Sequence, residues 1–339
     1  MSAVLRVDNL HVSVGGGSGT SSAGAAAARE AVRDVSFTIG RGESVGLVGE
    51  SGSGKTLTCR AVLGVLPPGV AVTGGGIHLG GGSSGADVEL TGLDRRGWDA
   101  VRGNRLAAVF QDPASYLNPS LTVGRQLAEQ LRLKRRLPRN QTRAAAVELL
   151  AAMGLRRATA VYDQYPHELS GGMLQRALIA IAVAGEPELL VADEATTALD
   201  AAVQAEVLDL LRQLREERGL ALLLVSHDLA VVAEVCDRVA VFYAGEIVEQ
   251  GPTADVIANP RHPYTEALLR VASLGDWRRR DLEVIPGRPP EPGAMPVGCR
   301  FAARCAHATD TCATPVALST VDDRQVRCHR AATLELVGA

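Results

Sequence analysis

The chain has 339 residues, 46% of them hydrophobic, which suffices for one large domain with a buried core and a smaller appendage. Its formal net charge of -3 argues against a general nucleic-acid-binding protein, because neutralising phosphates requires a basic surface. No apolar run is long enough to span a bilayer, and Arg6 and Asp8 interrupt the position of a signal peptide's apolar core, so we expect a cytoplasmic protein.

The first third of the chain predicts strands around a single helix. Strand-like runs, VLRVDNLHVSV and AVRDVSFTIG, flank a Gly/Ser/Ala-rich loop at 15–28. Residues 43–49 form a continuous apolar run, which is typical of a strand buried on both faces. A glycine-rich turn and the helix KTLTCRAVLGVL follow. We expect loops around one or two strands at 74–97, a strand at 105–110, and then a turn in QDPASYLNP.

The remainder predicts helices first and then an α/β pattern. Residues from about 121 to 187 are helical in pattern, and strands return at 188–193 and 221–226, on either side of an amphipathic helix. RVAVFYAGEIVEQG predicts an antiparallel hairpin that turns at Ala244 and Gly245. A short helix, YTEALLRVAS, precedes a Pro-rich linker at 285–296. The pattern predicts an α/β core with a helical insertion and a small cysteine-bearing tail.

The segment GESGSGKT fits the phosphate-loop pattern, in which two glycines bracket four residues and precede Lys and Ser or Thr. Glycines allow consecutive backbone N–H groups to turn toward a phosphate, and the following helix offers its positive amino-terminal end. We expect Lys55 to contact the β- and γ-phosphates and Thr56 to bind Mg²⁺. The alternative is a glycine-rich turn without a ligand. The predicted nucleotide-binding residues are Gly49, Glu50, Ser51, Gly52, Ser53, Gly54, Lys55 and Thr56.

Two carboxylates end the apolar run ELLVADE. Asp193 is expected to hold Mg²⁺, and Glu194 to polarise an attacking water as general base. Considered alone, a strand that ends in a solvated acidic turn is the better interpretation. The phosphate loop upstream favours the catalytic interpretation.

The stretch LSGGMLQRALIAIA decides the family. Its Ser-Gly-Gly turn opens a helix and creates a second anion site, although alone it would be an ordinary helix cap. Together with the phosphate loop, it resembles the signature of ATP-binding-cassette (ABC) ATPases, over residues 4–270 or so. Gln111 matches the family's Q-loop, TALD at 197–200 its D-loop, and His227 its switch histidine. Each of these three matches is weak in isolation.

The resemblance implies a P-loop ABC nucleotide-binding domain with an antiparallel amino-terminal β subdomain and a helical insertion at about 112–187. It implies ATP and Mg²⁺ as cofactors, catalytic roles for Glu194, His227 and Gln111, and Mg²⁺ contacts for Thr56, Gln111 and Asp193. Two such domains pair head to tail, so that one chain's signature completes the other chain's ATP site. The further nucleotide-binding residues that it implies are Ser170, Gly171, Gly172, Gln175 and Asp200. The family usually stacks adenine on an aromatic residue near the end of the first strand, where this chain has Val14, so the base site stays unassigned.

Four of the six cysteines lie in the tail, with the spacing Cys299-x5-Cys305-x6-Cys312-x15-Cys328. In a reducing compartment such a cluster favours metal ligands over disulfides, and so small a module needs a staple to fold. The spacing lacks the close pair that is usual in zinc sites, while iron–sulfur clusters accept more varied spacings; His307 or His329 could replace a cysteine in either. HPYTEALL, the linker and GCRFAARC resemble the carboxy-terminal extension of dipeptide, oligopeptide and nickel importer ATPases. That resemblance implies a [4Fe–4S] cluster, with zinc as the alternative.

These features predict an ATP-hydrolysing subunit of a peptide importer, bound peripherally to the cytoplasmic face of the membrane. Its expected partners are a paralogous ATPase, two permeases and, indirectly, an extracytoplasmic binding protein, with no nucleic acid. A nickel or other small-solute importer, or a soluble ABC ATPase of DNA repair or translation, is the alternative. The expected domains are residues 1–260 for the ATPase, 261–296 for a helix and linker, and 297–339 for the four-cysteine module. The basic run at 132–139 faces either lipid headgroups or solvent.

Overall fold

The computed structural model describes residues 3–15, 29–80, 87–195, 200–272, 284–291 and 293–338. The strands are β1 (Ala3–Val14), β2 (Arg29–Gly40), β3 (Ser44–Val48), β4 (Val70–Leu79), β5 (Val88–Glu89), β6 (Leu106–Phe110), β7 (Leu189–Asp193), β8 (Ala221–Ser226), β9 (Arg238–Tyr243), β10 (Glu246–Pro252), β11 (Ser319–Val321) and β12 (Arg324–Val326). The α-helices are α1 (Lys55–Leu63), α2 (Arg95–Val101), α3 (Pro113–Tyr116), α4 (Val123–Arg135), α5 (Arg139–Ala152), α6 (Ala158–Asp163), α7 (Gly171–Val183), α8 (Ala201–Arg218), α9 (Leu229–Val235), α10 (Thr253–Ala258) and α11 (Pro263–Ala272). No helix of this described part is long and apolar enough to cross a membrane.

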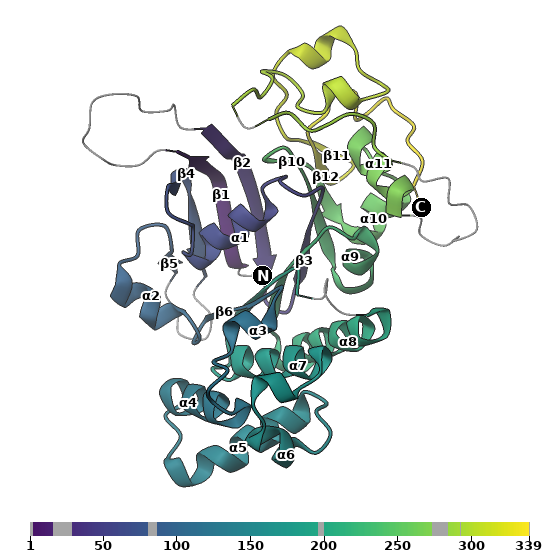
Figure 1. Ribbon diagram of the computed structural model, residues 1–339. Helices are drawn as coiled ribbons and strands as arrows, with labels where there is room; N and C mark the ends of the chain where they lie inside the picture. Colours follow the sequence, from purple (N-terminus) through teal and green to yellow (C-terminus); the bar gives the residue numbers. More distant parts are fainter. Residues whose placement is uncertain are drawn as a thin grey trace.

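Two sheets organise the molecule (Figure 1). An antiparallel sheet has the order β2-β1-β4-β5, and a mixed sheet has the order β11-β12-β10-β9-β3-β8-β7-β6, with parallel pairing from β9 through β6. Strands β3, β7 and β8 are buried at every position, as their continuous apolar runs predict. The expected amino-terminal antiparallel subdomain and α/β core are therefore both present.

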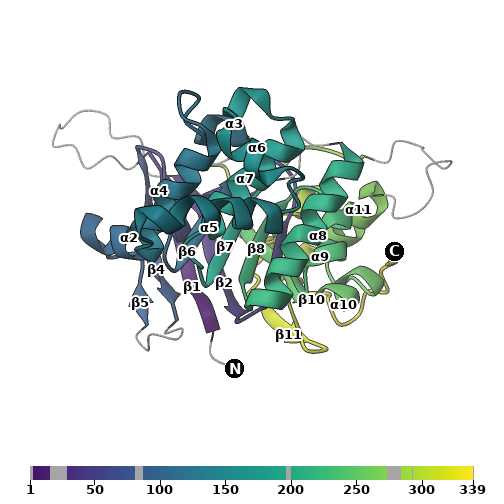
Figure 2. The same cartoon turned by 90° about the horizontal axis from the view of Figure 1, so that it is seen from below.

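Alternate side chains of the central strands enter two different cores. In β8, Leu223 and Val225 pack with α1 and the antiparallel sheet, whereas Leu222 and Leu224 pack on the opposite face. Helix α1 contacts β1, β2 and β4 of one sheet and β7 and β8 of the other, so it lies between the two sheets. Helices α7, α8 and α9 cover the other face (Figure 2). This layering places the amino-terminal end of α1 beside the ends of the parallel strands.

The helical insertion stands at one end of the mixed sheet and contains helices α3 to α6, with α7 returning to the sheet (Figure 1). The predicted helical character of 121–187 is confirmed. Four short helices, α2, α3, α9 and α10, were missed. Helix α2 forms in a stretch that the sequence predicted as loops, because Asp94 caps it by accepting the N–H of Gly97 at 2.8 Å. Helix α3 replaces part of the predicted turn after β6, capped by Asp112.

The carboxy-terminal segment, residues 297–338, joins the mixed sheet. Strands β11 and β12 form a hairpin, and β12 pairs with β10 through Glu249 opposite Val326. Apart from this hairpin, the segment contains only two short 3₁₀ turns among its described residues. The tail that the sequence set apart behind a linker therefore shares the core sheet, although the domain boundaries themselves stay predictions.

Candidate nucleotide site

The phosphate loop connects β3 to α1, and its glycines are required by its geometry. Gly49 has φ 151°, and a Cβ there would lie 2.1 Å from the carbonyl oxygen of Phe242. Gly54, at the start of α1, has φ 103°, a conformation that residues other than glycine rarely adopt. A side chain at Gly49 would clash with Phe242, and one at Gly54 would strain the backbone. The loop is thus closely folded against β9, and the first turn of α1 follows it directly.

Lys55 lies inside this loop. Its side chain is 4% exposed, and Nζ donates to the carbonyl oxygens of Gly49 at 2.6 Å and Glu50 at 2.9 Å. Burial lowers the pKa of Lys55, while the nearby carboxylates of Glu194 and Asp193 oppose that shift. Three main-chain and side-chain oxygens of the loop therefore surround the ammonium, since Ser53 Oγ also lies 3.3 Å away.

Two of the three residues predicted to hold Mg²⁺, Thr56 and Asp193, lie together. Thr56 Oγ1 donates to Asp193 Oδ1 at 3.4 Å, and Asp193 is only 6% exposed. Burial raises the pKa of Asp193, and the neighbouring charge of Glu194 raises it further. A hydroxyl beside a carboxylate is the oxygen donor set that Mg²⁺ prefers, so this pair fits the expected ion.

The catalytic candidates share one edge of the sheet because each follows the carboxyl end of a parallel strand. Gln111 follows β6, Glu194 follows β7 and His227 follows β8, while the phosphate loop follows β3. Carboxyl ends of parallel strands meet at the same edge, which is where α/β proteins bind ligands. His227 Nδ1 lies 4.0 Å from Glu194 Oε1. The structure therefore brings these residues together from four separate stretches of sequence.

Glu194 occupies a constrained position. Its φ is 50°, in the left-handed region that residues other than glycine seldom adopt, and its N–H donates to Val225 O at 3.1 Å. This turn redirects the chain immediately after β7 and leaves the carboxylate partly exposed, at 23%, beside the half-exposed ring of His227. Backbone strain of this kind is concentrated at functional sites.

The signature motif lies apart from the phosphate loop. Ser170 caps α7 by accepting the N–H of Met173 at 3.4 Å, and Ser170 and Gly172 line a cavity of about 520 Å³. That cavity shares no lining residue with the cavity at the phosphate loop. Within one chain, then, the two predicted anion sites do not face a common space.

Two other predicted contacts differ in their surroundings. Gln175 is 1% exposed, and its Nε2 has no hydrogen-bond partner among the described residues, so its side chain does not reach the signature surface. Asp200 caps α8 by accepting the N–H of Val203 at 3.0 Å and is exposed. The rest of the predicted D-loop, 197–199, lies outside the described residues.

Comparison with known proteins identifies the family. The pattern described as "ABC transporter" matches residues 32–197, and the pattern "Oligopeptide/dipeptide transporter, C-terminal region" matches residues 248–312. A provisionally named peptide import ATP-binding protein of Brucella melitensis is 46% identical over 308 residues, covering 88% of this chain and 91% of the relative. The chain belongs to the ATP-binding subunits of ABC transporters. It is accordingly an ATP hydrolase whose activity is coupled to transport.

Two further relatives agree with this membership. The oligopeptide transport ATP-binding protein AppD of Bacillus subtilis is 43% identical over 300 residues, covering 88% of this chain and 90% of AppD. Among solved structures, the dimeric ATP-binding cassette MJ0796 bound to ADP and Pi has a TM-score of 0.61 at 26% identity, covering 74% of this chain and 98% of the cassette. This likeness supports the ABC ATPase fold for this chain.

The four cysteines of this ABC subunit gather in the carboxy-terminal segment. Two sulfurs accept backbone hydrogen bonds from two residues further on, Cys305 from His307 N–H and Cys328 from Arg330 N–H, both at 3.4 Å. Burial first, and the charges of the other three cysteines second, raise the pKa of Cys299 to about 11. Among the residues that the structure describes, no three His, Cys, Asp or Glu side chains are placed to hold a single metal ion. The expected metal site is therefore not confirmed.

A cavity that sequence reasoning missed adjoins the phosphate loop. It has a volume of about 360 Å³ and lies between Ser51–Ser53 of the loop, Val14 of β1, and Pro289, Pro290 and Met295 of the linker. Its wall is mainly apolar, and this volume lies within the range of small-molecule sites. Only folding brings the linker to this place, because nothing in the linker's composition points to β1.

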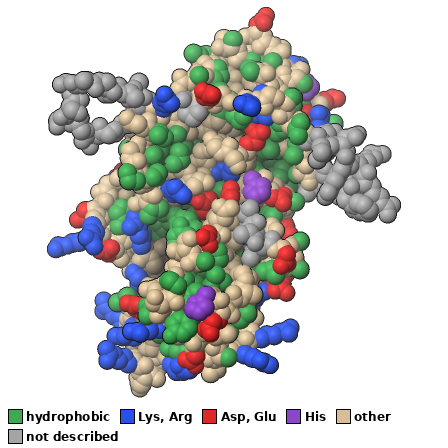
Figure 3. Space-filling model, viewed as in Figure 1, with side chains coloured by type: hydrophobic (Ala, Val, Ile, Leu, Met, Phe, Trp, Pro, Cys, Tyr) green, Lys and Arg blue, Asp and Glu red, His purple; other side chains and the backbone are tan. Residues whose placement is uncertain are grey.

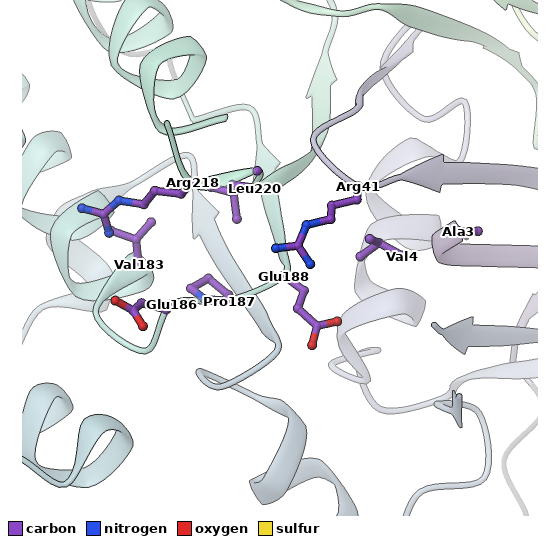
Figure 4. Close-up of a pocket in the computed structure, with 10 residues that line it drawn as sticks. Ala3, Val4, Arg41, Val183, Glu186, Pro187, Glu188, Arg218 and Leu220 are labelled. Atoms are coloured by element: carbon purple, nitrogen blue, oxygen red, sulfur yellow. The ribbon is translucent and has the colours of Figure 1, made fainter. Parts of the chain in front are cut away.

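A second cavity, of about 330 Å³, lies at the opposite edge of the sheet (Figure 4). It is lined by residues that precede the parallel strands, among them Arg41 before β3, Glu188 before β7 and Leu220 before β8. None of the predicted site residues lines it. The residues predicted to bind nucleotide therefore lie away from this cavity.

Proposed function

We propose that this chain is the ATP-hydrolysing subunit of an importer that takes up di- or oligopeptides. The observation that supports this most directly is the two-part match, in which an ABC cassette is followed by the carboxy-terminal region of oligopeptide and dipeptide transporters. The names of the relatives from Brucella melitensis and Bacillus subtilis point the same way.

We propose that ATP binds with its phosphates in the loop Gly49–Thr56. Lys55 would exchange its hydrogen bonds to the loop carbonyls for hydrogen bonds to the β- and γ-phosphates. Charged phosphate oxygens are the stronger acceptors for an ammonium group. Thr56 and Asp193 would hold Mg²⁺, which neutralises charge on the transferred phosphoryl group. Glu194 would take a proton from the attacking water, His227 would orient that carboxylate and the γ-phosphate, and Gln111 would contact the metal and the insertion.

The purine base would enter the cavity beside Val14. The phosphate loop forms one side of this cavity, and the prolines and Met295 offer flat or soft apolar contacts to a ring. This arrangement supplies base contacts without the aromatic residue that other family members place on the first strand.

The subunit would act in a head-to-tail dimer with a paralogous ATPase. The separate cavities at the loop and the signature support this arrangement, because Ser170, Gly171 and Gly172 can then serve the partner's nucleotide. The dimer would lie at the cytoplasmic face of the membrane beneath two permeases, fed by an extracytoplasmic binding protein. Lys and Arg side chains gather over the helical insertion in Figure 3, and the exposed arginines of the insertion are Arg125, Arg132, Arg136, Arg139, Arg143, Arg156 and Arg157.

Transport by the reconstituted complex tests the proposal. The subunit, its ATPase partner and the permeases are placed in liposomes with the binding protein, and uptake of labelled di- and oligopeptides is followed with and without ATP. ATP-dependent peptide uptake that excess nickel does not reduce is expected. Uptake of nickel alone would assign the solute-importer alternative, and co-purification with nucleic acid instead of permeases would favour a soluble ABC ATPase.

We further propose that Cys299, Cys305, Cys312 and Cys328 hold a [4Fe–4S] cluster with a structural role, with a single zinc ion as the alternative. The backbone N–H bonds to the sulfurs of Cys305 and Cys328 support thiolate ligands, because such bonds stabilise negative charge on sulfur. Iron, acid-labile sulfide and zinc are measured in the anaerobically purified chain. About four irons and four sulfides per chain are expected; zinc without iron would identify the alternative, and neither metal would reject both.

A further inference from the structure

We propose that Arg304 positions the phosphate loop, so that the carboxy-terminal segment sets the affinity of this chain for ATP. The inference rests on the proposed location of the nucleotide at Gly49–Thr56. It assigns to the segment a role in nucleotide binding that concerns neither the transported solute nor a metal. Arg304 would act through Glu50 and not by touching the phosphates, so it is a positioning residue.

Arg304 and Glu50 form a bidentate ion pair between the carboxy-terminal segment and the phosphate loop. Nη1 of Arg304 lies 2.7 Å from Glu50 Oε2, and Nη2 lies 2.9 Å from Glu50 Oε1. The Arg304 side chain is 3% exposed and that of Glu50 29% exposed. A bidentate ion pair with one buried partner has a far more defined geometry than an exposed ion pair.

The remaining donors of Arg304 fix the guanidinium in place. Nε donates to Pro286 O at 2.8 Å, Nη2 to Ile285 O at 3.1 Å and Nη1 to Tyr243 Oη at 3.3 Å. All five N–H donors of the side chain are thereby used, two on Glu50 and three on the linker and β9. Lysine has neither the fork nor enough donors for this arrangement.

Glu50 in turn connects the segment to the residue expected to contact phosphate. Its N–H donates to Tyr264 Oη at 2.9 Å, and its carbonyl accepts from Lys55 Nζ at 2.9 Å. The ring of Phe301, three residues before Arg304, packs on Tyr243 and Tyr264 at centroid distances of 5.1 and 5.3 Å. The backbone and side chain of this one loop residue are thus held by three different elements.

The charge of Glu50 explains why such a hold would matter. A carboxylate in the loop that receives a triphosphate repels it, and an unpaired carboxylate would also compete for the ammonium of Lys55. Arg304 neutralises the carboxylate and holds it toward the segment. Without Arg304, a smaller fraction of the chains would have a loop that can bind phosphate. The apparent affinity for ATP falls in proportion to that fraction.

The test compares equilibrium binding of a fluorescent ATP analogue with Mg²⁺ to the full-length chain and its variants. Arg304→Gln is expected to weaken binding about tenfold, while kcat of the assembled complex at saturating ATP changes less than about twofold, because Glu194 and His227 follow other strands. Adding Glu50→Gln to Arg304→Gln should restore most of the affinity, since the repelling charge is then gone. A purely structural role of Arg304 would not allow that rescue.

Arg143→Gln is the matched control. Arg143 also forms a bidentate ion pair, with Asp163 at 3.1 and 2.6 Å, but on the exposed surface of the insertion. Arg143→Gln should therefore bind the ATP analogue with wild-type affinity. Wild-type affinity of Arg304→Gln, or a double variant no better than the single one, would overturn the inference. If Arg304→Gln does not fold, Arg304→Lys carries the test, with about threefold weaker binding expected and unchanged binding overturning the inference. Failure of the wild-type chain to bind ATP would instead reject the proposed nucleotide site.

Discussion

The carboxyl edge of the mixed sheet and the carboxy-terminal segment are built in different ways. At the edge, the catalytic candidates Gln111, Glu194 and His227 each directly follow a hydrogen-bonded parallel strand, so the backbone topology places their side chains. The segment has little regular structure and is fastened by buried arginines. The difference shows that one functional region can depend on strand order, while its neighbour depends on individual ion pairs.

Four arginines of the segment make this attachment, each with a side chain 5% exposed or less: Arg300, Arg304, Arg324 and Arg327. Arg327 lies 2.9 Å from Asp34 of β2, and Arg324 bonds to the carbonyls of Asp255 and Asn259. Burial lowers the pKa of Arg300, while Glu246 opposes that shift. Buried charges are costly unless they are paired, so removal of one partner should strongly destabilise the folded chain.

The largest expected effect lies at the carboxyl edge. Glu194→Gln should reduce ATP turnover at least about 100-fold, because it removes the general base but keeps the size of the side chain. Nucleotide binding and thermal stability should stay close to wild type. Steady-state hydrolysis by the assembled complex measures the loss, with Glu217→Gln on the exposed face of α8 as the control. Turnover within threefold of wild type would exclude Glu194 as the base.

In the segment, the corresponding loss is one of stability. Arg324→Met leaves Glu249, which is 0% exposed, without its buried cation, and should lower the free energy of unfolding by about 3 kcal/mol. Adding Glu249→Gln should recover part of that loss, because no unpaired carboxylate then remains buried. Urea denaturation measures both.

Arg143→Met removes an ion pair on the exposed insertion and serves as the control for Arg324→Met. It should leave the urea midpoint unchanged, since exposed pairs contribute little. Equal losses for Arg324→Met and Arg143→Met would mean that the segment does not depend on its buried pairs, and the contrast with the edge would disappear.

The smallest expected effect is that of the Asp193 charge, at the carboxyl edge, on the free energy of unfolding. The pKa of Asp193 is raised by burial, so ionising it weakens the folded state: the penalty is absent below the ordinary value of 3.8 and grows until pH exceeds the folded pKa. Asp193→Asn should therefore stabilise the nucleotide-free chain by about 1 kcal/mol at pH 7, and the gain should vanish as pH falls toward 3.8. Denaturation in urea from pH 4 to 7.5 measures it. A gain independent of pH would contradict the electrostatic origin.

The sequence by itself predicted the candidate residues at the carboxyl edge and most of the elements that build this edge. Its motifs are local: a buried strand, a turn of special residues and a helix cap occupy neighbouring positions, as in Gly49–Thr56 and Ser170–Gly172. Continuous apolar runs identified β3, β7 and β8 for the same reason. Helices α2 and α3 escaped because they are short and depend on single caps, Asp94 and Asp112, within stretches rich in turn residues.

Only the tertiary structure decided how the carboxy-terminal segment meets the rest. Glu50 and Arg304 are 254 positions apart, and no periodicity relates one arginine among the chain's 35 basic residues to one particular carboxylate. The pairing of β12 with β10 and the cavity between Val14 and the linker are likewise contacts between distant stretches. Local patterns record how each stretch folds. Which stretches then touch is settled by packing of the whole chain, since burial and charge pairing are gained only when distant residues come together.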